Sequence, residues 1–323
     1  MNFVIIGAGA LGSIYAAYLT RAGHQVALVA RGERAALLAR HGISIEGKAA
    51  FSTPCNVVTH ADTLRQTDVV IVAIKTYDTE QALAPLHGLT TKSAFSVQNG
   101  VLKNQQLSEV FGQQATLGAV GMLGGEVLPA KNGLPGAVRY NVVGPTILGE
   151  PAGGHSSRVN ELVDVLVKAG LEARASDSIT SAEWSKFVGW SGFSTLAVMT
   201  RLPTWRFLSD ADTALIAARI MRETAAVASK HGVTLQDSGF SSTKFLNASE
   251  EDAIKAVQAH GEKMRVTAPD FRQSILQDAD RNRRLEVHET LDYTLMLATR
   301  LGVATPTLDL CCRVLRAVSR AAG

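Results

Sequence analysis

The feature that most constrains this chain is a glycine-rich turn between an apolar strand and a helix at its N-terminus. Residues 3–6 form a short, wholly apolar run, which predicts a strand buried on both faces, as in a parallel sheet. Gly7, Gly9 and Gly12 follow in the pattern G-x-G-x-x-G, and a helical run over residues 10–19 comes next. This order indicates a dinucleotide-binding turn, with a merely tight strand–helix connection as the competing interpretation.

Each glycine of this turn has a separate physical role. The first permits the tight turn, the second lets the backbone approach a pyrophosphate, and the third lets the helix pack close to the strand. The N–H groups and partial positive charge of the helix N-terminus favour an anion there. We therefore expect the whole segment to bind the coenzyme, namely Gly7, Ala8, Gly9, Ala10, Leu11 and Gly12.

The end of the second predicted strand, residues 25–30, indicates which coenzyme the turn binds. A site that prefers NAD carries Asp or Glu near this position, where the carboxylate bonds the ribose 2′-hydroxyl. This chain has Ala30 and Arg31 instead, with Arg34 close behind. A guanidinium pairs bidentately with a 2′-phosphate, which a carboxylate would repel. Arg31 therefore predicts NADP(H), and the alternative is an ordinary solvated arginine.

Strands and helices continue to alternate, which predicts a Rossmann-type, doubly wound α/β domain. A buried strand over residues 68–74 ends just before Lys75, and another over residues 94–97 ends shortly before Asn99. Ligands of doubly wound sheets bind outside the carboxyl ends of the strands. We therefore expect Lys75 to contact coenzyme or substrate and Asn99 to bond both. The alternatives are a solvated loop lysine and a simple Asn-Gly turn.

The pattern changes twice further along the chain. Between Ala115 and Glu150, frequent glycines separate short apolar runs and predict hairpins that extend the sheet with antiparallel strands. The domain boundary is placed near Asp177, which gives domains of residues 1–177 and 178–323, and the second domain is predicted to be all-α. Its predicted helices cover residues 183–200 behind a Thr180–Glu183 capping box, 212–231, 250–264, a segment starting at Pro269, 285–301, and a segment starting at Pro306.

Length and composition exclude several classes of protein. A chain of 323 residues is expected to hold two domains, because single cores rarely grow beyond about 250–300 residues. The net charge of +3 and the lack of a long apolar run argue against nucleic-acid and membrane partners. The 3 cysteines show no metal-ligand spacing and no disulfide framework, and no signal peptide is evident. We expect a cytoplasmic protein without a metal, and the apolar helical faces are compatible with a homodimer.

Further motifs accompany the glycine turn. They are Arg31, Lys75, Asn99-Gly100, Glu183-Trp184-Ser185-Lys186-Phe187, Ser274-Ile275-Leu276-Gln277-Asp278, Arg284-Leu285-Glu286 and Gly302-Val303-Ala304-Thr305-Pro306. With this set the chain resembles the ketopantoate reductase (2-dehydropantoate 2-reductase) family over essentially its full length. The resemblance implies a Rossmann domain, an all-helical second domain, a cleft between them, and reduction of a 2-keto acid by NADPH.

The same resemblance implies the catalytic residues. The family's catalytic lysine falls on Lys186 and its active-site glutamate on Glu286. An ammonium group beside the substrate can stabilise and protonate the alkoxide that hydride delivery leaves, and the glutamate can orient that lysine and bond the coenzyme's ribose. Ser274 matches a hydroxyl that bonds the substrate carboxylate. The alternatives are a surface lysine, a charge at a helix N-terminus and a solvated serine.

The chain departs from the family where the substrate is recognised. Trp190 and Ser194 lie one and two turns after Lys186, on the same helix face, where the family usually has asparagines. An indole offers one donor and takes up space, so the substrate shell is altered while the reaction residues remain. Three further departures are Thr204, in the predicted loop after this helix, His288 and Leu291.

Three functions therefore stay open. The first is reduction of 2-dehydropantoate to pantoate. The second is reduction of a different, bulkier 2-keto acid, for which Trp190 suits the site better. The third is a sensor that binds NADPH without turnover, which has no need of Lys186 and Glu286.

Overall fold

The computed structural model describes residues 1–237 and 241–322. Its contacts divide the chain into two units, Met1–Asn99 with Lys103–Thr180, and Gly100–Leu102 with Ser181–Gly323. Every strand in the described part of the chain belongs to the first unit, and the second is built from helices. The predicted fold class, a Rossmann-type α/β domain followed by an all-α domain, is confirmed.

A five-stranded parallel sheet forms the centre of the first unit, with strand order β5-β2-β1-β6-β7. In that order the strands are Asn56–Val58, Gln25–Val29, Asn2–Ile6, Gln66–Val72 and Thr90–Ser96. The helical segments of this unit are α1 (Ala10–Arg21), α2 (Gly32–His41), η1 (Ala61–Thr63), η2 (Thr76–Asp78), α3 (Thr79–Leu83), η3 (Ala84–Leu86), α4 (Lys103–Phe111) and α5 (Ser157–Lys168).

Both faces of this sheet are buried, which explains why its strands are continuous apolar runs. Phe3 and Ile5 of β1 pack in one core with residues of α1 and α5. Val4 and Ile6 pack in a second core with residues of α3 and α4. Since successive side chains of a strand point to opposite faces, the buried part of a strand, such as residues 3–6 of β1 or 69–72 of β6, needs apolar residues at successive positions.

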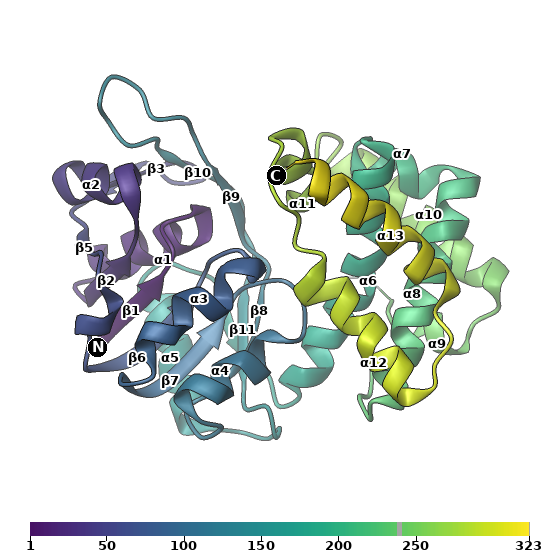
Figure 1. Ribbon diagram of the computed structural model, residues 1–323, viewed down its shortest axis with the longest axis horizontal. Helices are drawn as coiled ribbons and strands as arrows, with labels where there is room; N and C mark the ends of the chain where they lie inside the picture. The colour runs from purple at the N-terminus through teal and green to yellow at the C-terminus, as the bar shows by residue number, and fades with distance from the viewer. Residues whose placement is uncertain (238–240, 323) are drawn as a thin grey trace. The chain divides into compact units, whose positions relative to one another are not determined.

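The hairpin segment differs from its prediction, because its strands form two sheets of their own. One has the order β4-β3-β10-β9 and the other β12-β11-β8. Their strands are β3 (Ile43–Gly47), β4 (Phe51–Thr53), β8 (Gly118–Gly121), β9 (Gly124–Val127), β10 (Val138–Val142), β11 (Thr146–Gly149) and β12 (Ala173–Ala175). The hairpins are antiparallel as predicted, and β10 and β11 also pair in parallel with β3 and β12. The segment before β8 still joins the central sheet, because the Ala94 N–H of β7 donates to the Ala115 carbonyl at 2.7 Å and the Leu117 N–H donates to the Ala94 carbonyl at 2.8 Å. The loop between β9 and β10 projects away from its sheet (Figure 1).

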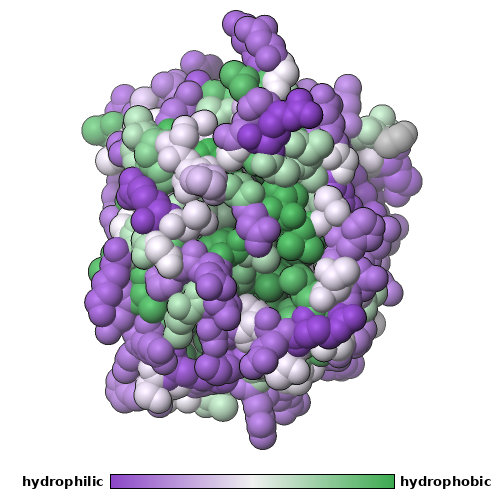
Figure 2. All heavy atoms as spheres, turned by 90° about the vertical axis from the view of Figure 1, so that its left-hand side faces the viewer, coloured by the Kyte–Doolittle hydropathy of each residue, from purple (hydrophilic) through white to green (hydrophobic). Residues whose placement is uncertain are grey.

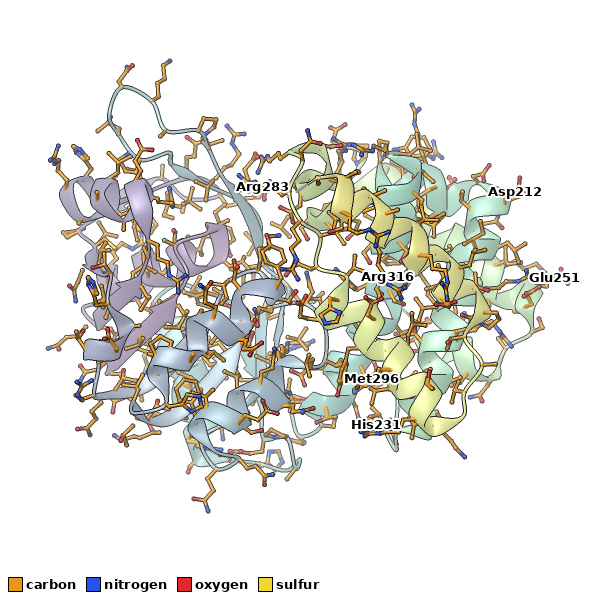
Figure 3. All side chains as sticks on the ribbon, in the orientation of Figure 1. Asp212, His231, Glu251, Arg283, Met296 and Arg316 are labelled. Atoms are coloured by element: carbon orange, nitrogen blue, oxygen red, sulfur yellow. The ribbon has the colours of Figure 1, made fainter. Side chains whose placement is uncertain are left out.

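The second unit packs its helices around one apolar core, to which α6, α8, α10 and α13 all contribute buried residues. Its helices are α6 (Ile179–Thr200), α7 (Thr204–Ser209), α8 (Ala211–Lys230), α9 (Lys244–Asn247), α10 (Glu250–Thr267), α11 (Ser274–Asp280), the π-helix η4 (His288–Asp292), α12 (Tyr293–Leu301) and α13 (Pro306–Ala321). An ion pair joins two of them, since Arg316 of α13, labelled in Figure 3, lies 2.8 Å from Asp292.

Three predicted helix starts are wrong. Helix α6 begins at Ile179, so Thr180 lies inside the helix and not at the N-cap position that a capping box requires. The Thr180 hydroxyl donates to the Pro151 carbonyl at 3.1 Å. Helix α11 begins at Ser274 rather than at Pro269. The segment predicted as one helix over residues 285–301 becomes helical only at His288.

In the described ranges, no helix combines the length and the apolar composition that crossing a bilayer requires. Figure 2 shows hydrophobic residues gathered toward the middle of the face that lies on the left in Figure 1, with hydrophilic residues around them.

Candidate active site

Two glycines of the turn after β1 are required by the fold itself. Gly7 has a φ of +106°, and its N–H donates to the Val29 carbonyl at 3.0 Å. A Cβ atom on Gly7 would lie 2.4 Å from Ile74, and one on Gly12 would lie 1.9 Å from the Gly7 carbonyl oxygen. Neither position can therefore carry a side chain without moving the backbone.

Gly9 is different, because the fold leaves room for a side chain there. It is the N-cap of α1 with a φ of −70°, and the nearest atom to a Cβ would be the Ala73 carbonyl oxygen at 3.9 Å. The first helical hydrogen bond of α1 runs from the Ser13 N–H to the Gly9 carbonyl, at 3.0 Å. The N–H groups of the first turn come before this bond, so the helix itself supplies no acceptor for them. The space beside Gly9 and the helix N-terminus together suit the approach of an anionic group.

Two arginines follow β2, and the structure gives them different surroundings. Arg31 is exposed at the N-cap of α2, and its Nη1 lies 3.5 Å from Oε1 of Gln81. Arg34 is partly buried, and its Nε donates to the Ala8 carbonyl at 2.6 Å. Of the two, Arg31 has the exposure that a phosphate-binding side chain needs.

Lys75 and Asn99 lie at the sheet edge that the glycine turn occupies. Ile6, Val72 and Ser96 are partners in register across β1, β6 and β7, and the chain leaves all three parallel strands at the same end. Lys75 is the N-cap of η2, and Ala73 and Ile74 separate it from the end of β6. The strand register therefore places the segments that follow β1, β6 and β7 at the same edge of the sheet, as the sequence predicted.

A buried hydrogen-bond network, which the sequence did not predict, fixes the turn before Asn99. The Ser96 hydroxyl donates to Gln98 Oε1 at 2.7 Å, and Gln98 Nε2 donates to the Thr79 hydroxyl at 2.8 Å. Lys103 is buried, and its Nζ donates to the carbonyls of Gln98 at 3.2 Å and Ala119 at 2.5 Å. The signal in the sequence was a run of polar residues directly after an apolar strand.

Helix α6 carries three of the predicted site residues, Lys186, Trp190 and Ser194. The Trp190 ring stacks on Phe187, with centroids 5.6 Å apart and planes at 21°, and belongs to the core of the helical unit. The Ser194 hydroxyl lies 3.4 Å from the Ser191 carbonyl of its own helix. Packing therefore fixes the indole, and it occupies volume that an asparagine would leave open.

The other predicted residues of the second unit lie around α11 and the π-helix. Ser274 is the exposed first residue of α11. Glu286 follows Leu285 and precedes Val287, both of which belong to the same core as Phe187. The Thr290 hydroxyl donates to the Glu286 carbonyl, which ties the π-helix to the glutamate. A π-turn of this kind inside a helical run often marks a functional position.

Gly100 packs against this π-helix as part of the second unit. Its φ is +86°, and a Cβ atom there would lie 2.9 Å from the Thr290 methyl carbon. Gly100 is therefore required by the positive φ of the turn and also by close packing against the segment that follows Glu286.

Thr204, predicted to lie in a loop, is instead the first residue of α7. It is buried, its N–H donates to the Phe271 carbonyl at 3.1 Å, and Gln273 Nε2 lies 3.5 Å from its hydroxyl. These contacts join the start of α7 to the segment that precedes α11. Among the residues that the structure describes, no group of three His, Cys, Asp or Glu side chains has the geometry to hold a metal ion.

Comparison with known families identifies the family to which the chain belongs. A family model described as ketopantoate reductase PanE/ApbA matches residues 3–153, and the model of that family's C-terminal part matches residues 178–319. This chain belongs to the ketopantoate reductase family. It is thus an oxidoreductase, as the sequence predicted.

Individual relatives agree with this assignment over their full lengths. The 2-dehydropantoate 2-reductase of Mesorhizobium japonicum is 30% identical, over 96% of this chain and 95% of its own. The solved PanE/ApbA family ketopantoate reductase of Ralstonia eutropha JMP134 has a TM-score of 0.83 at 24% identity, covering 100% of this chain and 99% of its own.

A D-mandelate dehydrogenase solved with NADH and anilino(oxo)acetate shares the fold as well. Its TM-score is 0.84 at 20% identity, and the match covers 100% of this chain and 99% of that one. At this identity the likeness concerns the fold alone.

Proposed function

We propose that this chain reduces a 2-keto acid to the 2-hydroxy acid with NADPH, and that 2-dehydropantoate is the substrate, giving pantoate. The observation that carries the proposal is family membership along both units of the chain. Lys186 and Glu286, the two residues that the resemblance assigns to the reaction, are both present.

The first unit fits a bound dinucleotide. Gly9 leaves open space at the N-terminus of α1, where a pyrophosphate gains backbone N–H donors and the favourable end of the helix dipole. Arg31 supports a 2′-phosphate, because it is exposed after β2 and can pair with the phosphate bidentately. Lys75 and Asn99, at the same sheet edge, are proposed to contact the coenzyme. Bound NADPH supplies a hydride to the carbonyl carbon of the substrate.

The second unit is proposed to supply the proton and the substrate contacts. The Lys186 ammonium attracts the carboxylate of the keto acid, stabilises the negative charge that develops on the carbonyl oxygen, and protonates that oxygen. Glu286 orients the ammonium and bonds a ribose or substrate hydroxyl. Ser274, exposed at the start of α11, donates to the substrate carboxylate, and Asn99 donates to the substrate from the first unit. Trp190 and Ser194 shape the remaining wall.

The test is a substrate survey with a catalytic variant. NADPH oxidation is measured with 2-dehydropantoate and with a panel of other 2-keto acids, for the wild-type protein and Lys186→Ala. We expect turnover of 2-dehydropantoate, reduced by about 100-fold or more in the variant. NADPH binding without turnover of any acid would contradict the proposal and indicate a sensor. Unchanged turnover in Lys186→Ala would remove the lysine from the mechanism.

A second substrate is favoured by one observation, the packed indole of Trp190. Its stacking on Phe187 holds an apolar group where the family usually has an asparagine. A buried polar group that loses its partner costs roughly 1–3 kcal/mol, so a polar substrate loses affinity here. The alternative is therefore reduction of a bulkier, more apolar 2-keto acid by the same residues. A clear preference for such an acid in the panel would support it.

Trp190→Asn separates the two substrates. If the indole obstructs 2-dehydropantoate, the variant should raise the ratio of kcat/KM for 2-dehydropantoate to kcat/KM for an aromatic 2-keto acid. The ratio is the proper readout, because removing a large core ring also costs about 3–5 kcal/mol of stability and lowers the active fraction for both acids alike. An unchanged ratio would mean that the ring does not contact the substrate.

A further inference from the structure

Arg34 contacts the coenzyme turn from outside it. The side chain starts in the first turn of α2, and its Nε donates to the carbonyl oxygen of Ala8 at 2.6 Å. Its Nη2 lies 3.3 Å from the hydroxyl of Ser13 in α1, and its Nη1 lies 3.5 Å from the Gly136 carbonyl in the loop between β9 and β10. One guanidinium thus links three separate segments of the first unit.

The bond to Ala8 determines the direction of the next N–H group. The Ser13 hydroxyl also donates to the Ala8 carbonyl, at 3.2 Å, so this oxygen has two donors on one side. A trans peptide unit is planar, and its C=O and N–H point in opposite directions. Holding the Ala8 carbonyl toward Arg34 and Ser13 therefore turns the Gly9 N–H to the opposite side, and it keeps a carbonyl dipole from turning toward an approaching anion.

From this geometry we propose that Arg34 is a positioning residue of the coenzyme site, which orients the Ala8–Gly9 peptide toward the diphosphate of the coenzyme. The inference rests on the proposed function, because it requires that a dinucleotide binds at the turn. It assigns the two arginines after β2 to different parts of the ligand. Arg31 recognises the 2′-phosphate, which only NADPH carries, and Arg34 supports the diphosphate, which NADPH and NADH share.

The surroundings of the two side chains agree with this division. Arg31 is exposed and can move to meet a ligand. Arg34 is half-buried and held by the contacts described above, and burial lowers the pKa of its guanidinium. An arginine stays protonated in proteins even so, and the charge therefore adds to the positive potential at the helix N-terminus.

The experiment compares three ligands on matched variants. Dissociation constants for NADPH, NADH and adenosine 2′-monophosphate are measured calorimetrically with wild-type protein, Arg34→Met, Arg34→Lys and Arg31→Ala. Adenosine 2′-monophosphate carries the 2′-phosphate but no diphosphate. We expect Arg34→Met to weaken NADPH and NADH by a similar factor of about ten and to leave adenosine 2′-monophosphate unchanged. Arg34→Lys, which keeps the charge, should recover part of the loss.

Arg31→Ala gives the opposite pattern, with NADPH and adenosine 2′-monophosphate weakened and NADH little changed. Loss of NADPH alone in Arg34→Met would overturn the proposal, because it would mean a direct contact with the 2′-phosphate. Equal affinity of wild type and Arg34→Met for both coenzymes would overturn it as well. If the wild-type protein binds neither coenzyme, it is the proposed function that fails.

A second variant covers the case in which Arg34→Met does not fold. Ser13→Ala removes the other donor to the Ala8 carbonyl while leaving Arg34 and its charge in place. It should weaken both coenzymes in the same proportion, by less than Arg34→Met, with adenosine 2′-monophosphate again unaffected. A loss of all three ligands would indicate general damage to the unit and would contradict a role confined to the diphosphate.

Discussion

At the scale of single residues, the three glycines of the first turn are glycines for different reasons. A Cβ atom at Gly12 would lie 1.9 Å from a backbone oxygen, whereas at Gly9 the nearest atom would be 3.9 Å away. The fold therefore requires Gly12, and nothing in the fold requires Gly9. Because the fold does not require glycine at position 9, the glycine there is better explained by a ligand that needs the space beside it.

This difference leads to a prediction for two alanine variants. Gly9→Ala should unfold at nearly the wild-type temperature and bind NADPH much more weakly, because its methyl group occupies the space for the pyrophosphate. Gly12→Ala should lower the melting temperature markedly, because α1 must move away from β1. Melting curves with and without NADPH measure both effects. Equal destabilisation by the two substitutions would refute the distinction.

A second prediction concerns the choice of coenzyme. Arg31→Ala should raise the KM for NADPH by about 10- to 100-fold, the loss expected when a charged hydrogen-bonding partner of a phosphate is removed. The KM for NADH should stay nearly constant, because that coenzyme has no 2′-phosphate. Steady-state kinetics with both coenzymes test this. An equal loss for the two would show that Arg31 does not contact the phosphate.

At the scale of helices and strands, an ion pair anchors α5 to the end of β11. Arg158 of α5 donates to Glu150 through Nε at 2.7 Å and Nη2 at 2.6 Å, and also to the Lys92 carbonyl at 3.1 Å. The hydrogen bond from Arg158 holds the pKa of the Glu150 carboxyl below its usual 4.5. A carboxyl whose folded pKa is lowered stabilises the fold above the unfolded pKa, and this contribution disappears as the pH falls through the folded pKa.

We therefore predict that Glu150→Gln lowers the melting temperature at pH 7, with the difference from wild type shrinking below about pH 4. The effect should be modest, because the pair is only partly buried and solvent screens it. Thermal melts of both proteins at pH 7 and pH 3 provide the comparison. A temperature difference that is the same at both pH values would show that the carboxylate's charge does not matter.

The same scale shows what the sequence could and could not predict. The strands of the central sheet were predictable, because burial on both faces leaves continuous apolar runs such as residues 3–6. Helix starts were less predictable, because distant contacts override local signals. Pro269 is a good first helical residue, yet the Phe271 carbonyl accepts from Thr204, which delays α11 to Ser274.

The segment predicted as one helix over residues 285–301 shows a similar limit. Leu285 donates its N–H to the Ser319 hydroxyl on α13 at 3.0 Å, outside any helix. Residues 288–292 then form a π-helix, a local expansion that hydrophobic spacing does not show. The identity of Glu286 was available from its motif, whereas the tie between its carbonyl and Thr290 required the structure.

At the scale of the whole molecule, the two units were visible in the sequence as a change from alternating strands and helices to helices alone. The assignment of Gly100–Leu102 to the helical unit was not visible. It depends on long-range contacts, such as that of Gly100 with Thr290 and that of Val101 with the helical core. The proposed reaction draws on both units, because the coenzyme turn lies in the first and Lys186 in the second.

The proposed reaction depends above all on Lys186, which is proposed to protonate the oxygen at which the substrate is reduced. A crystal structure of the protein with NADP⁺ and the bound 2-hydroxy acid product tests it most directly. If Lys186 is the proton donor, its Nζ should lie within about 3 Å of the product's hydroxyl oxygen. A complex holding both ligands, in which Lys186 lies away from that oxygen and another group donates to it, would contradict this role.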